Sequence, residues 1–321
     1  MELKNRQLRE IYADLLVDAA ARNDAIVSVD ADLRKAAKTN AFADKYPERA
    51  INVGVAEANM IGVAAGLANM GKVPFTHTFT PFATRRVFDQ VTLSVAYAGL
   101  HVKMVGSDPG IMAQLNGATH MSFEDVGLMR TLPDMVIFEP VDGVQLAACF
   151  DEIVAHPGPV YIRLLRQEFE AVFEEGTSFS LGKAHILEEG DDVVIFATGI
   201  LVAEALKAVS ILKEEGISAT LVNIHTVKPL DTETIVRTAK RCGGVVTAEN
   251  HNVINGLGSA VAETLCEHHP VPMKRVGVMD RFGEVGKKDY LMETFGLKAD
   301  NIVTAARDVI RRKEETGRKH G

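Results

Sequence analysis

The stretch "VPFTHTFTPFATRRVFDQVTLSVAYAGLHVKMVG" (Val73–Gly106) decides the fold class. Residues 73–79 and 101–106 are short and largely apolar, which predicts two buried strands, and the longer pattern at 84–99 predicts a helix between them. A strand, a crossover helix and a second strand form the repeating unit of a parallel sheet. The stretch therefore predicts an α/β domain.

The same alternation extends along the chain in both directions. Further strands are expected at residues 25–30, 135–140, 192–199, 218–224 and 243–249, and further helices at 5–22, 56–70, 143–155 and 202–216. The alternation pauses at a polar, acidic segment (166–184) that is typical of a linker. We therefore expect two α/β domains, at 1–170 and 189–321 with a linker at 171–188, each a mostly parallel sheet with helices on both faces.

Composition excludes several classes of protein. In 321 residues no uncharged apolar run is long enough to span a bilayer, and the charged start "MELKNRQLRE" is unlike a signal peptide, so no membrane association is expected. Cys149, Cys242 and Cys266 are widely spaced, which predicts a reducing cytoplasm rather than a disulfide framework or a thiolate zinc site. The net charge is −8 and the only basic run is the tail at 311–320, so nucleic acid is not an expected partner.

Glu57 is a single acid at the start of the small, apolar run "EANMIGVAAGLANMG". An acid in the first turn of a helix can serve only to stabilise the helix dipole, and that interpretation stays open. Ala58, Gly62 and Gly66 make the helix thin, which suits a packed subunit interface. A carboxyl half-buried at such an interface could share a proton with a nitrogen of a ligand.

Two further segments carry candidate ligand-binding residues. Phe79 and Phe82 lie just past the carboxyl end of a strand, where ligands bind in open α/β sheets, although plain core packing is the alternative. The segment 106–135 is long for a strand-to-helix connection and holds Asp108, Asn116 and His120 among glycines. Long loops at strand ends are commonly functional, so we count these three residues as candidates.

Other motifs in the sequence give only weak support to dinucleotide binding, metal binding or hydrolysis. "NGLGSAV" (255–261) is a partial dinucleotide fingerprint and is better interpreted as a tight strand-to-helix turn. "EGDDVV" (189–194) precedes a strand, which is the wrong side of the sheet for metal ligands. The sequence has neither a P-loop nor a G-x-S-x-G or H-E-x-x-H motif, so the usual nucleotide and hydrolase functions lose support.

In this order, the motifs resemble the transketolase family. "VGVAEANMIGVAAGLA", "FTHTFTPFATRRVFDQV", "GATH" and "YIRLLRQ" resemble its pyrimidine-binding domain, and "KPLDTETI" and "ENHNVINGLGSAVAE" resemble its carboxy-terminal domain. The G-D-G…N motif with which the family binds thiamine diphosphate and Mg²⁺ does not occur. The resemblance therefore implies the carboxy-terminal subunit of a split transketolase. A separate amino-terminal subunit would hold the diphosphate and the metal, with the active site at the interface of an α2β2 heterotetramer.

The resemblance assigns roles toward the cofactor to four residues. It implies that Glu57 hydrogen-bonds a ring nitrogen of the cofactor's aminopyrimidine. Phe82 and Phe79 would pack on that ring and exclude water, which strengthens the hydrogen bond. Asp32, in "DADL", matches a family acid near the subunit interface and is counted with the cofactor-binding residues.

Substrate roles follow in the same way. His120, in "GATH", matches a histidine that contacts the sugar's hydroxyls and can carry a proton near neutral pH. Arg166 and Arg9 match arginines that bind the substrate's terminal phosphate, a task that suits the planar guanidinium; a surface ion pair is the alternative for each. The implied substrates are small anionic sugars.

Four positions depart from the family pattern. Asp108 stands where the family has a histidine, and Asn116 stands where it has an acid. Arg85 replaces a third aromatic residue, and His77 adds an imidazole where small residues are common. We interpret these four as substrate-binding residues of a pocket retuned for an unusual ketose that is branched, deoxy or sulfonated.

The expected activity is transfer of a two-carbon ketol unit between a ketose, phosphorylated or otherwise anionic, and an aldose. Three alternatives stay open from the sequence. The chain could be the beta subunit of a 2-oxoacid dehydrogenase, an enzyme similar to deoxyxylulose-phosphate synthase, or a thiamine-binding protein without activity.

Overall fold

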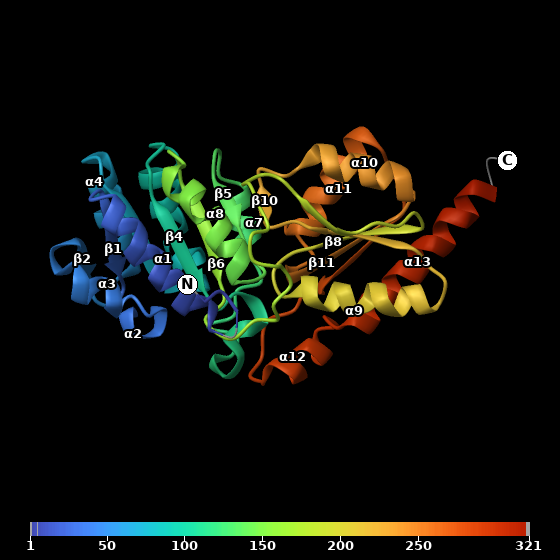
Figure 1. Ribbon diagram of the computed structural model, residues 1–321, viewed down its shortest axis with the longest axis horizontal. Coiled ribbons are helices and arrows are strands. Elements are labelled where there is room, and N and C mark those ends of the chain that lie inside the picture. The colour runs from blue at the N-terminus through green and yellow to red at the C-terminus, as the bar shows by residue number, and fades with distance from the viewer. Residues whose placement is uncertain (1, 5, 319–321) are drawn as a thin grey trace.

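The computed structural model describes residues 2–4 and 6–318 and forms two α/β domains (Figure 1). The first sheet has the order β10-β5-β6-β4-β3-β1-β2, in which β10 is antiparallel to β5 and the other neighbours run parallel. Its strands are β1 (Ile26–Asp30), β2 (Ala50–Asn52), β3 (Val73–Phe79), β4 (Lys103–Ser107), β5 (Val136–Phe138), β6 (Val160–Leu164) and β10 (Thr226–Lys228).

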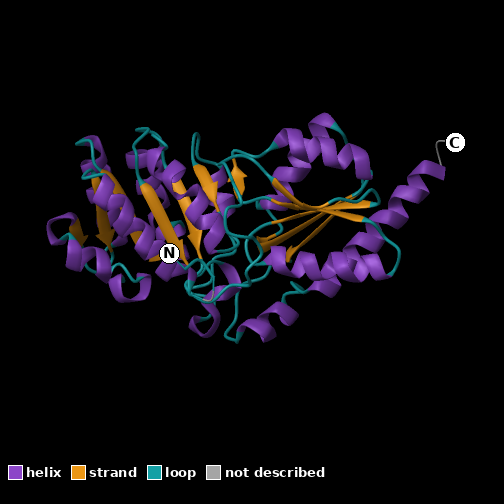
Figure 2. Cartoon of the chain, in the orientation of Figure 1, coloured by secondary structure: helices purple, strands orange, loops and turns teal. Residues whose placement is uncertain are grey.

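The second sheet has the order β12-β11-β8-β9-β7, with β7 antiparallel to β9. Its strands are β7 (His185–Glu188), β8 (Val193–Ala197), β9 (Ala219–Asn223), β11 (Val245–Asn252) and β12 (Met273–Val278). Two mostly parallel sheets flanked by helices confirm the predicted fold class (Figure 2). The segment expected as a linker, 171–188, ends in the strand β7.

Helices cover both faces of each sheet. On the first sheet α1 and α8 pack on one face, and α4, α7 and the helical segment 85–96 pack on the other. Successive residues of a strand point to opposite faces, so Val105 joins the core with Leu16 of α1 while Met104 joins the core with Met60 of α4. On the second sheet α9 and α13 cover one face and α10 and α11 the other.

The helices of the structure have the following bounds. They are α1 (Leu8–Arg22), α2 (Arg34–Ala37), α3 (Asn40–Lys45), α4 (Glu57–Asn69), α5 (Thr80–Ala83), α6 (Phe88–Gln90), α7 (Asp125–Arg130), α8 (Gly143–Ala155), α9 (Leu201–Glu214), α10 (Thr232–Cys242), α11 (Leu257–His268), α12 (Lys288–Thr294) and α13 (Ala299–Arg318), with 3₁₀ turns η1 (Pro47–Arg49), η2 (Arg85–Val87) and η4 (Gly110–Asn116) and a π-helical turn η3 (Val91–Ala96). The first expected helix included Asn5, which lies outside the described residues. Among the described helices, none has the length and apolar character needed to cross a bilayer.

The helix expected at 84–99 is wrong as a single element. The segment consists of the turn η2, the short helix α6 and the π-helical turn η3. Thr84 leaves helical geometry (φ −122°, ψ −90°), and its hydroxyl donates to the carbonyl of Thr80 at 2.8 Å. A threonine side chain that takes the backbone acceptor in this way competes with regular helix formation. The break turns Arg85 and Arg86 toward different partners, which matters for the site below.

The two domains are joined by strand pairing and side-chain contacts as well as by the linker. Strand β10 belongs by sequence to the second half of the chain, yet it pairs with β5 at the edge of the first sheet. Lys228 at its end donates from Nζ to the carbonyl of Arg130 at 2.9 Å. Across the same junction the rings of Phe123 and Phe295 pack edge to face with centroids 5.3 Å apart. The first sheet is therefore completed by residues from beyond the linker.

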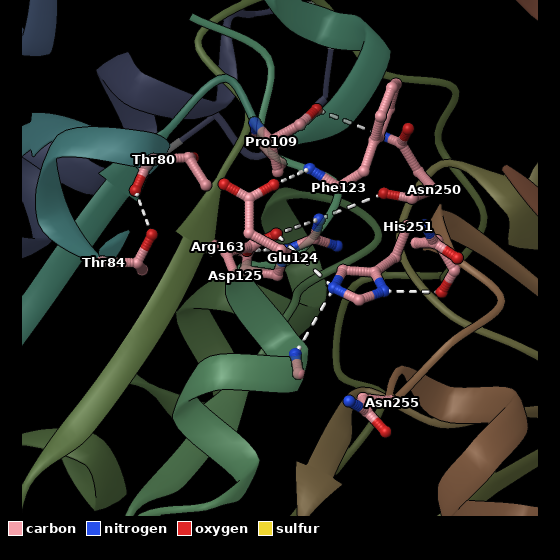
Figure 3. A network of polar contacts seen from close by, with 12 residues as sticks. Thr80, Thr84, Pro109, Phe123, Glu124, Asp125, Arg163, Asn250, His251 and Asn255 are labelled. Atoms are coloured by element: carbon pink, nitrogen blue, oxygen red, sulfur yellow. Dashed lines mark hydrogen bonds and ion pairs between the residues drawn. The ribbon is translucent and has the colours of Figure 1, made fainter. Parts of the chain in front are cut away.

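A buried charge network centred on Arg163 fills the junction (Figure 3). Arg163 lies on β6 and is 1% exposed. Its Nε donates to Asp125 Oδ2 at 2.7 Å, its Nη2 donates to the carbonyl of Asn250 on β11 at 3.1 Å, and its Nη1 forms an ion pair with Glu139 at 2.7 Å. Burial disfavours the charge on Asp125, but the guanidinium of Arg163 still holds the pKa of that carboxyl below its usual value.

We expect Arg163→Met to cost about 3–5 kcal/mol in the free energy of unfolding, because it leaves two buried carboxylates without a counter-charge. Denaturant unfolding followed by circular dichroism measures this loss. The matched control is Arg22→Met, which breaks an exposed ion pair with Asp151 and should leave the unfolding curve nearly unchanged. Similar curves for the two variants would contradict the importance of the network.

A second prediction concerns Lys103 on β4, whose burial lowers its pKa to about 6. Its Nζ donates to the carbonyls of His156 and Gly158 at 2.6 and 2.9 Å. Above pH 6 the unfolded chain binds a proton at this lysine that the folded chain has lost, so stability rises with pH at up to about 1.4 kcal/mol per pH unit. Urea unfolding between pH 7.5 and 9 should show this rise in the wild type and lose it in Lys103→Met. The exposed Lys72→Met should keep it, and equal slopes in all three proteins would refute the assignment.

Candidate active site

The candidate site lies along the carboxyl ends of four neighbouring parallel strands. The sheet order places β1, β3, β4 and β6 side by side. From the neighbouring pair β1 and β3, the chain adds its next strand on opposite sides, with β2 beside β1 and β4 beside β3. Such a switch in strand order leaves a crevice outside the carboxyl ends of the strands. Phe79 ends β3, and Asp108 and Arg166 follow β4 and β6. The parallel sheet therefore brings three residues from distant parts of the sequence to one edge.

An aromatic cluster forms the centre of the site. Phe79 ends β3, Phe82 lies in α5, and His120 lies in the loop after η4. The ring centroids are 6.1 Å apart for the Phe79–Phe82 pair, and the imidazole of His120 lies 5.6 and 5.2 Å from the two rings, always edge to face. His120 Nδ1 is also 2.9 Å from the hydroxyl of Thr119. The structure thus brings together three of the residues chosen from the sequence.

Glu57 joins this cluster through an arginine. It is the first residue of α4, its residue exposure is 5%, and no side chain caps this helix end. Arg86 donates from Nη1 to Glu57 Oε1 at 2.7 Å, and its guanidinium carbon lies 3.6 Å from the centre of the Phe82 ring. The side chain of Glu57 therefore lies between the N-terminus of α4 and the guanidinium of Arg86. Sequence reasoning missed Arg86, for which the four-residue spacing from Phe82 was the available signal.

Arg85 turns away from the aromatic rings. It donates from Nη1 to Glu124 at 2.8 Å and from Nη2 to the carbonyl of Thr119 at 3.0 Å. Thr119 directly precedes His120, so Arg85 braces the loop that carries the histidine. The sequence predicted a substrate contact for Arg85, and the structure gives it contacts to this loop.

A second group of charges lies on the other side of Phe79. Asp108 is 1% exposed and pairs with Arg166, whose guanidinium carbon lies 4.7 Å from the centre of the Phe79 ring. Burial raises the pKa of Asp108, and the pairing with Arg166 opposes that rise. Burial lowers the pKa of Arg9, and the positive charge of Arg166 lowers it further.

The N-terminal segment positions Arg9. Gln7 forms an antiparallel bridge with Glu168, and the backbone N–H of Leu8 donates to the carbonyl of Gln167 at 3.2 Å. Arg9 donates from Nε to the side chain of Gln7 at 2.9 Å and from Nη1 to the carbonyl of Ala36 at 2.7 Å. The start of the chain is thereby fixed against the segment that carries Arg166.

Three predicted site residues make none of the contacts described above. His77 is 1% exposed, with Nε2 2.7 Å from the hydroxyl of Tyr12 and Nδ1 3.7 Å from Asp30, and burial lowers its pKa. Asp32 is exposed beyond β1, where its carboxylate accepts a hydrogen bond from Asn52 at 3.2 Å. Asn116 is exposed at the end of η4. His77 therefore belongs to the interior of the domain and not to the aromatic cluster.

A cavity of about 520 Å³ lies at the junction of the two domains. Residues from both halves of the chain line it, among them Arg85, Phe123, Asn252 and Arg281. It meets the site at Arg85 and lies away from Glu57. Within residues 2–4 and 6–318, no group of three or more His, Cys, Asp or Glu side chains is arranged to hold a metal ion.

Comparisons with known proteins agree with this geometry. The model of the transketolase pyrimidine binding domain matches residues 4–171, and that of the transketolase C-terminal domain matches residues 182–302. The chain belongs to the transketolase family. It has the two domains of a carboxy-terminal split-transketolase subunit, and it is a transferase subunit that requires a partner chain.

Transketolase relatives of similar length support this assignment. The chain is 61% identical over 313 residues to the 6-deoxy-6-sulfo-D-fructose transketolase subunit SqwH of Clostridium sp. (strain MSTE9), covering 98% of this chain and 97% of that protein. It is 34% identical to an apulose-4-phosphate transketolase subunit of Actinobacillus succinogenes, covering 93% and 97% of the two chains. A solved split gene transketolase, described as an inactive beta4 tetramer, matches with a TM-score of 0.88 and 44% identity over 96% of this chain and 99% of that one.

The paired arginines of this transketolase subunit allow a matched test. Arg86→Gln leaves the buried carboxylate of Glu57 without its ion pair and should cost about 1–3 kcal/mol in stability. Arg85→Gln removes an ion pair to the half-exposed Glu124 and should cost less than about 1 kcal/mol. Thermal unfolding monitored by calorimetry compares the two. A larger loss for Arg85→Gln would show that the Glu57–Arg86 contact is not the important one.

Proposed function

We propose that this subunit supplies the pyrimidine-binding half of a thiamine-diphosphate-dependent transketolase that transfers a two-carbon ketol unit from an anionic ketose to an aldose. The observation that carries the proposal is the buried carboxylate of Glu57, set at a helix N-terminus beside Phe82. An acid in this position can hold a proton at a ring nitrogen, while the aromatic edges of Phe79 and Phe82 can receive a flat heteroaromatic ring.

The residues present fit one half of the cofactor. Glu57 and the two phenylalanines offer an acid and an apolar wall, as the aminopyrimidine ring requires. The described residues offer no cluster of acids for a metal-bound diphosphate. When bound, thiamine diphosphate supplies the nucleophilic carbon that takes up the two-carbon unit. We propose that the partner subunit holds the diphosphate and Mg²⁺.

Among the residues of this chain, Glu57, Arg86 and His120 would then have separate roles toward the cofactor and the sugar. Glu57 would hold the proton at the ring nitrogen, displacing Arg86, whose side chain is 45% exposed and free to turn outward. His120 would donate a hydrogen bond to a hydroxyl of the sugar and carry a proton to or from it. Phe79 and Phe82 would exclude water, which strengthens each of these polar contacts.

We propose a sulfonated ketose, with 6-deoxy-6-sulfo-D-fructose as the first candidate. The 61% identical relative is named for that sugar, and Asp108 stands beside Arg166 where a phosphate would meet a buried negative charge. Asn116 and His120 would contact the hydroxyls of the sugar. The same relative favours ketol transfer over the chemistry of a 2-oxoacid dehydrogenase or a deoxyxylulose-phosphate synthase.

The partner chain would be a separate amino-terminal transketolase subunit in an α2β2 assembly. One side of α4 supports this proposal, because Gly62 and Gly66 face open space there. Val55 and Met70 at its two ends are 76% and 80% exposed, and Tyr97 beyond the adjoining turn η3 is 87% exposed. Small and apolar residues exposed together are typical of subunit contacts. The described cysteines are free, which supports the proposed cytoplasmic location.

The test uses this chain together with the protein encoded beside it. Calorimetric titration of thiamine diphosphate and Mg²⁺ should show binding by the mixture and not by this chain alone. Ketol transfer from 6-deoxy-6-sulfo-D-fructose to an aldose should then fall about 10²–10⁴-fold in Glu57→Gln. Glu48→Gln, an exposed acid beside Arg49, is the matched control and should keep full activity. Tight cofactor binding by this chain alone, or full activity of Glu57→Gln, would refute the proposal.

A further inference from the structure

We propose that Asp108 is a specificity-determining residue, which sets the subsite around Arg166 and Arg9 for a substrate whose terminal group carries a single negative charge, as a sulfonate does. This inference rests on the proposed function, because it takes that subsite to receive the acidic end of the sugar. It adds a physical reason why the enzyme would prefer a sulfonate over a phosphate, although the two groups have similar shapes.

The contact between Asp108 and Arg166 occupies one edge of the guanidinium. Arg166 donates from Nε to Asp108 Oδ2 at 2.5 Å, its Nη2 pairs with the same oxygen, and its backbone N–H donates to Oδ1 at 3.3 Å. Among the contacts of the described residues, the Nη1 end of the guanidinium is left for a second oxyanion. Because the side chain of Arg166 is 19% exposed and that of Asp108 only 1%, a ligand reaches the arginine and not the acid.

The charges of the subsite sum to that of a single cation. Arg9 follows Leu8, whose backbone N–H donates to the carbonyl of Gln167, the residue after Arg166. Arg9 and Arg166 contribute two positive charges, and Asp108 removes one. A sulfonate brings one negative charge at every ordinary pH, so the group is neutralised. A phosphate monoester carries about −1.5 to −2 at pH 7, and its second charge would lie close to the buried carboxylate without compensation. Repulsion between the phosphate and this carboxylate is strong because the two negative charges would meet away from bulk water.

The backbone of the loop fixes the carboxylate in place. Asp108 has φ +55° and Gln114 has φ +48°, in a region that residues other than glycine seldom adopt. Gln114 donates from Nε2 to the side chain of Gln167 at 2.6 Å, which ties the loop to the residue after Arg166. Unusual backbone geometry that is held by its surroundings is common at ligand-binding sites. On this fixed loop, the hydrogen bonds from the backbone and side chain of Arg166 hold the carboxylate of Asp108 in place.

Two other ionisable groups, Glu10 and His120, lie beside residues that contact the subsite. Glu10 lies close enough to influence Arg9, but it forms an ion pair with Lys38 at 3.2 Å. His120 touches the same ring of Phe79 that Arg166 covers. His120 would contact the hydroxyls of the sugar, which both ketoses share, so it should contribute equally to the turnover of sulfonated and phosphorylated ketoses.

The test compares two ketoses that differ in the terminal group, 6-deoxy-6-sulfo-D-fructose and D-fructose 6-phosphate, on the assembled enzyme. The quantity measured is the ratio of their kcat/KM values at pH 5.5 and 7.5. Between these pH values the singly charged fraction of a phosphate ester with a pKa near 6 falls roughly 25-fold, while the sulfonate does not titrate. The preference for the sulfonate should therefore rise with pH, by up to about that factor.

Asp108→Asn removes the charge and keeps the shape and one acceptor oxygen. We expect it to lower the sulfonate preference at pH 7.5 about tenfold and to flatten its rise with pH. Glu10→Gln is the matched control, because it removes another negative charge near Arg9 without touching Arg166, and it should leave the ratio unchanged.

The outcomes separate this inference from the proposed function. Turnover of both ketoses with a ratio that does not change with pH in the wild type would overturn the inference and leave ketol transfer standing. An unchanged ratio in a folded Asp108→Asn enzyme, or an equal change in Glu10→Gln, would also overturn it. If Asp108→Asn does not fold, the wild-type pH series decides alone. Failure of the assembled enzyme on every ketose would overturn the proposed function itself.

Discussion

The buried guanidinium of Arg163 is the charge around which both domains and two loops of the candidate site are arranged. It stands three residues before Arg166 and binds Asp125, which follows the loop carrying His120. Its contact with the carbonyl of Asn250 brings the second sheet to the same point. A charge so deeply enclosed is tolerated only with its counter-charges in place. The loops of the candidate site are therefore held by a contact that is buried inside the protein.

Two arginine–aromatic contacts give the site its form. Arg86 covers Phe82 and pairs with Glu57, while Arg166 covers Phe79 and pairs with Asp108. Each unit combines a buried acid, a partly exposed arginine and a ring. The first would face the cofactor and the second the far end of the sugar. Under that proposal, the two similar units would together span the length of the substrate and meet at the aromatic cluster.

Local sequence patterns were enough for seven strands of the described chain, but they missed β2, β6, β7, β10 and β12. Most of the candidate site residues came from the resemblance to transketolase motifs and stay predictions. The apolar run of β3 and the residue that ends it, Phe79, follow from periodicity and from the rule for ligands at strand ends. The break at Thr84, the enclosure of His77 by Tyr12 and the partnership of Arg86 with Glu57 depend on contacts between distant residues. Those contacts leave no periodic trace, so they appear only in three dimensions.

The pairing of β10 with β5 has a consequence for how the domains can be separated. A sheet edge carries a row of backbone N–H and C=O groups that will pair with any extended chain. The three residues Thr226–Lys228 cover that edge on the first domain, although they lie far along the sequence from it. Cutting the chain between the domains would uncover β5 as a template for other molecules. The short strand β10, which belongs by sequence to the second half of the chain, therefore protects the first sheet from edge-to-edge aggregation.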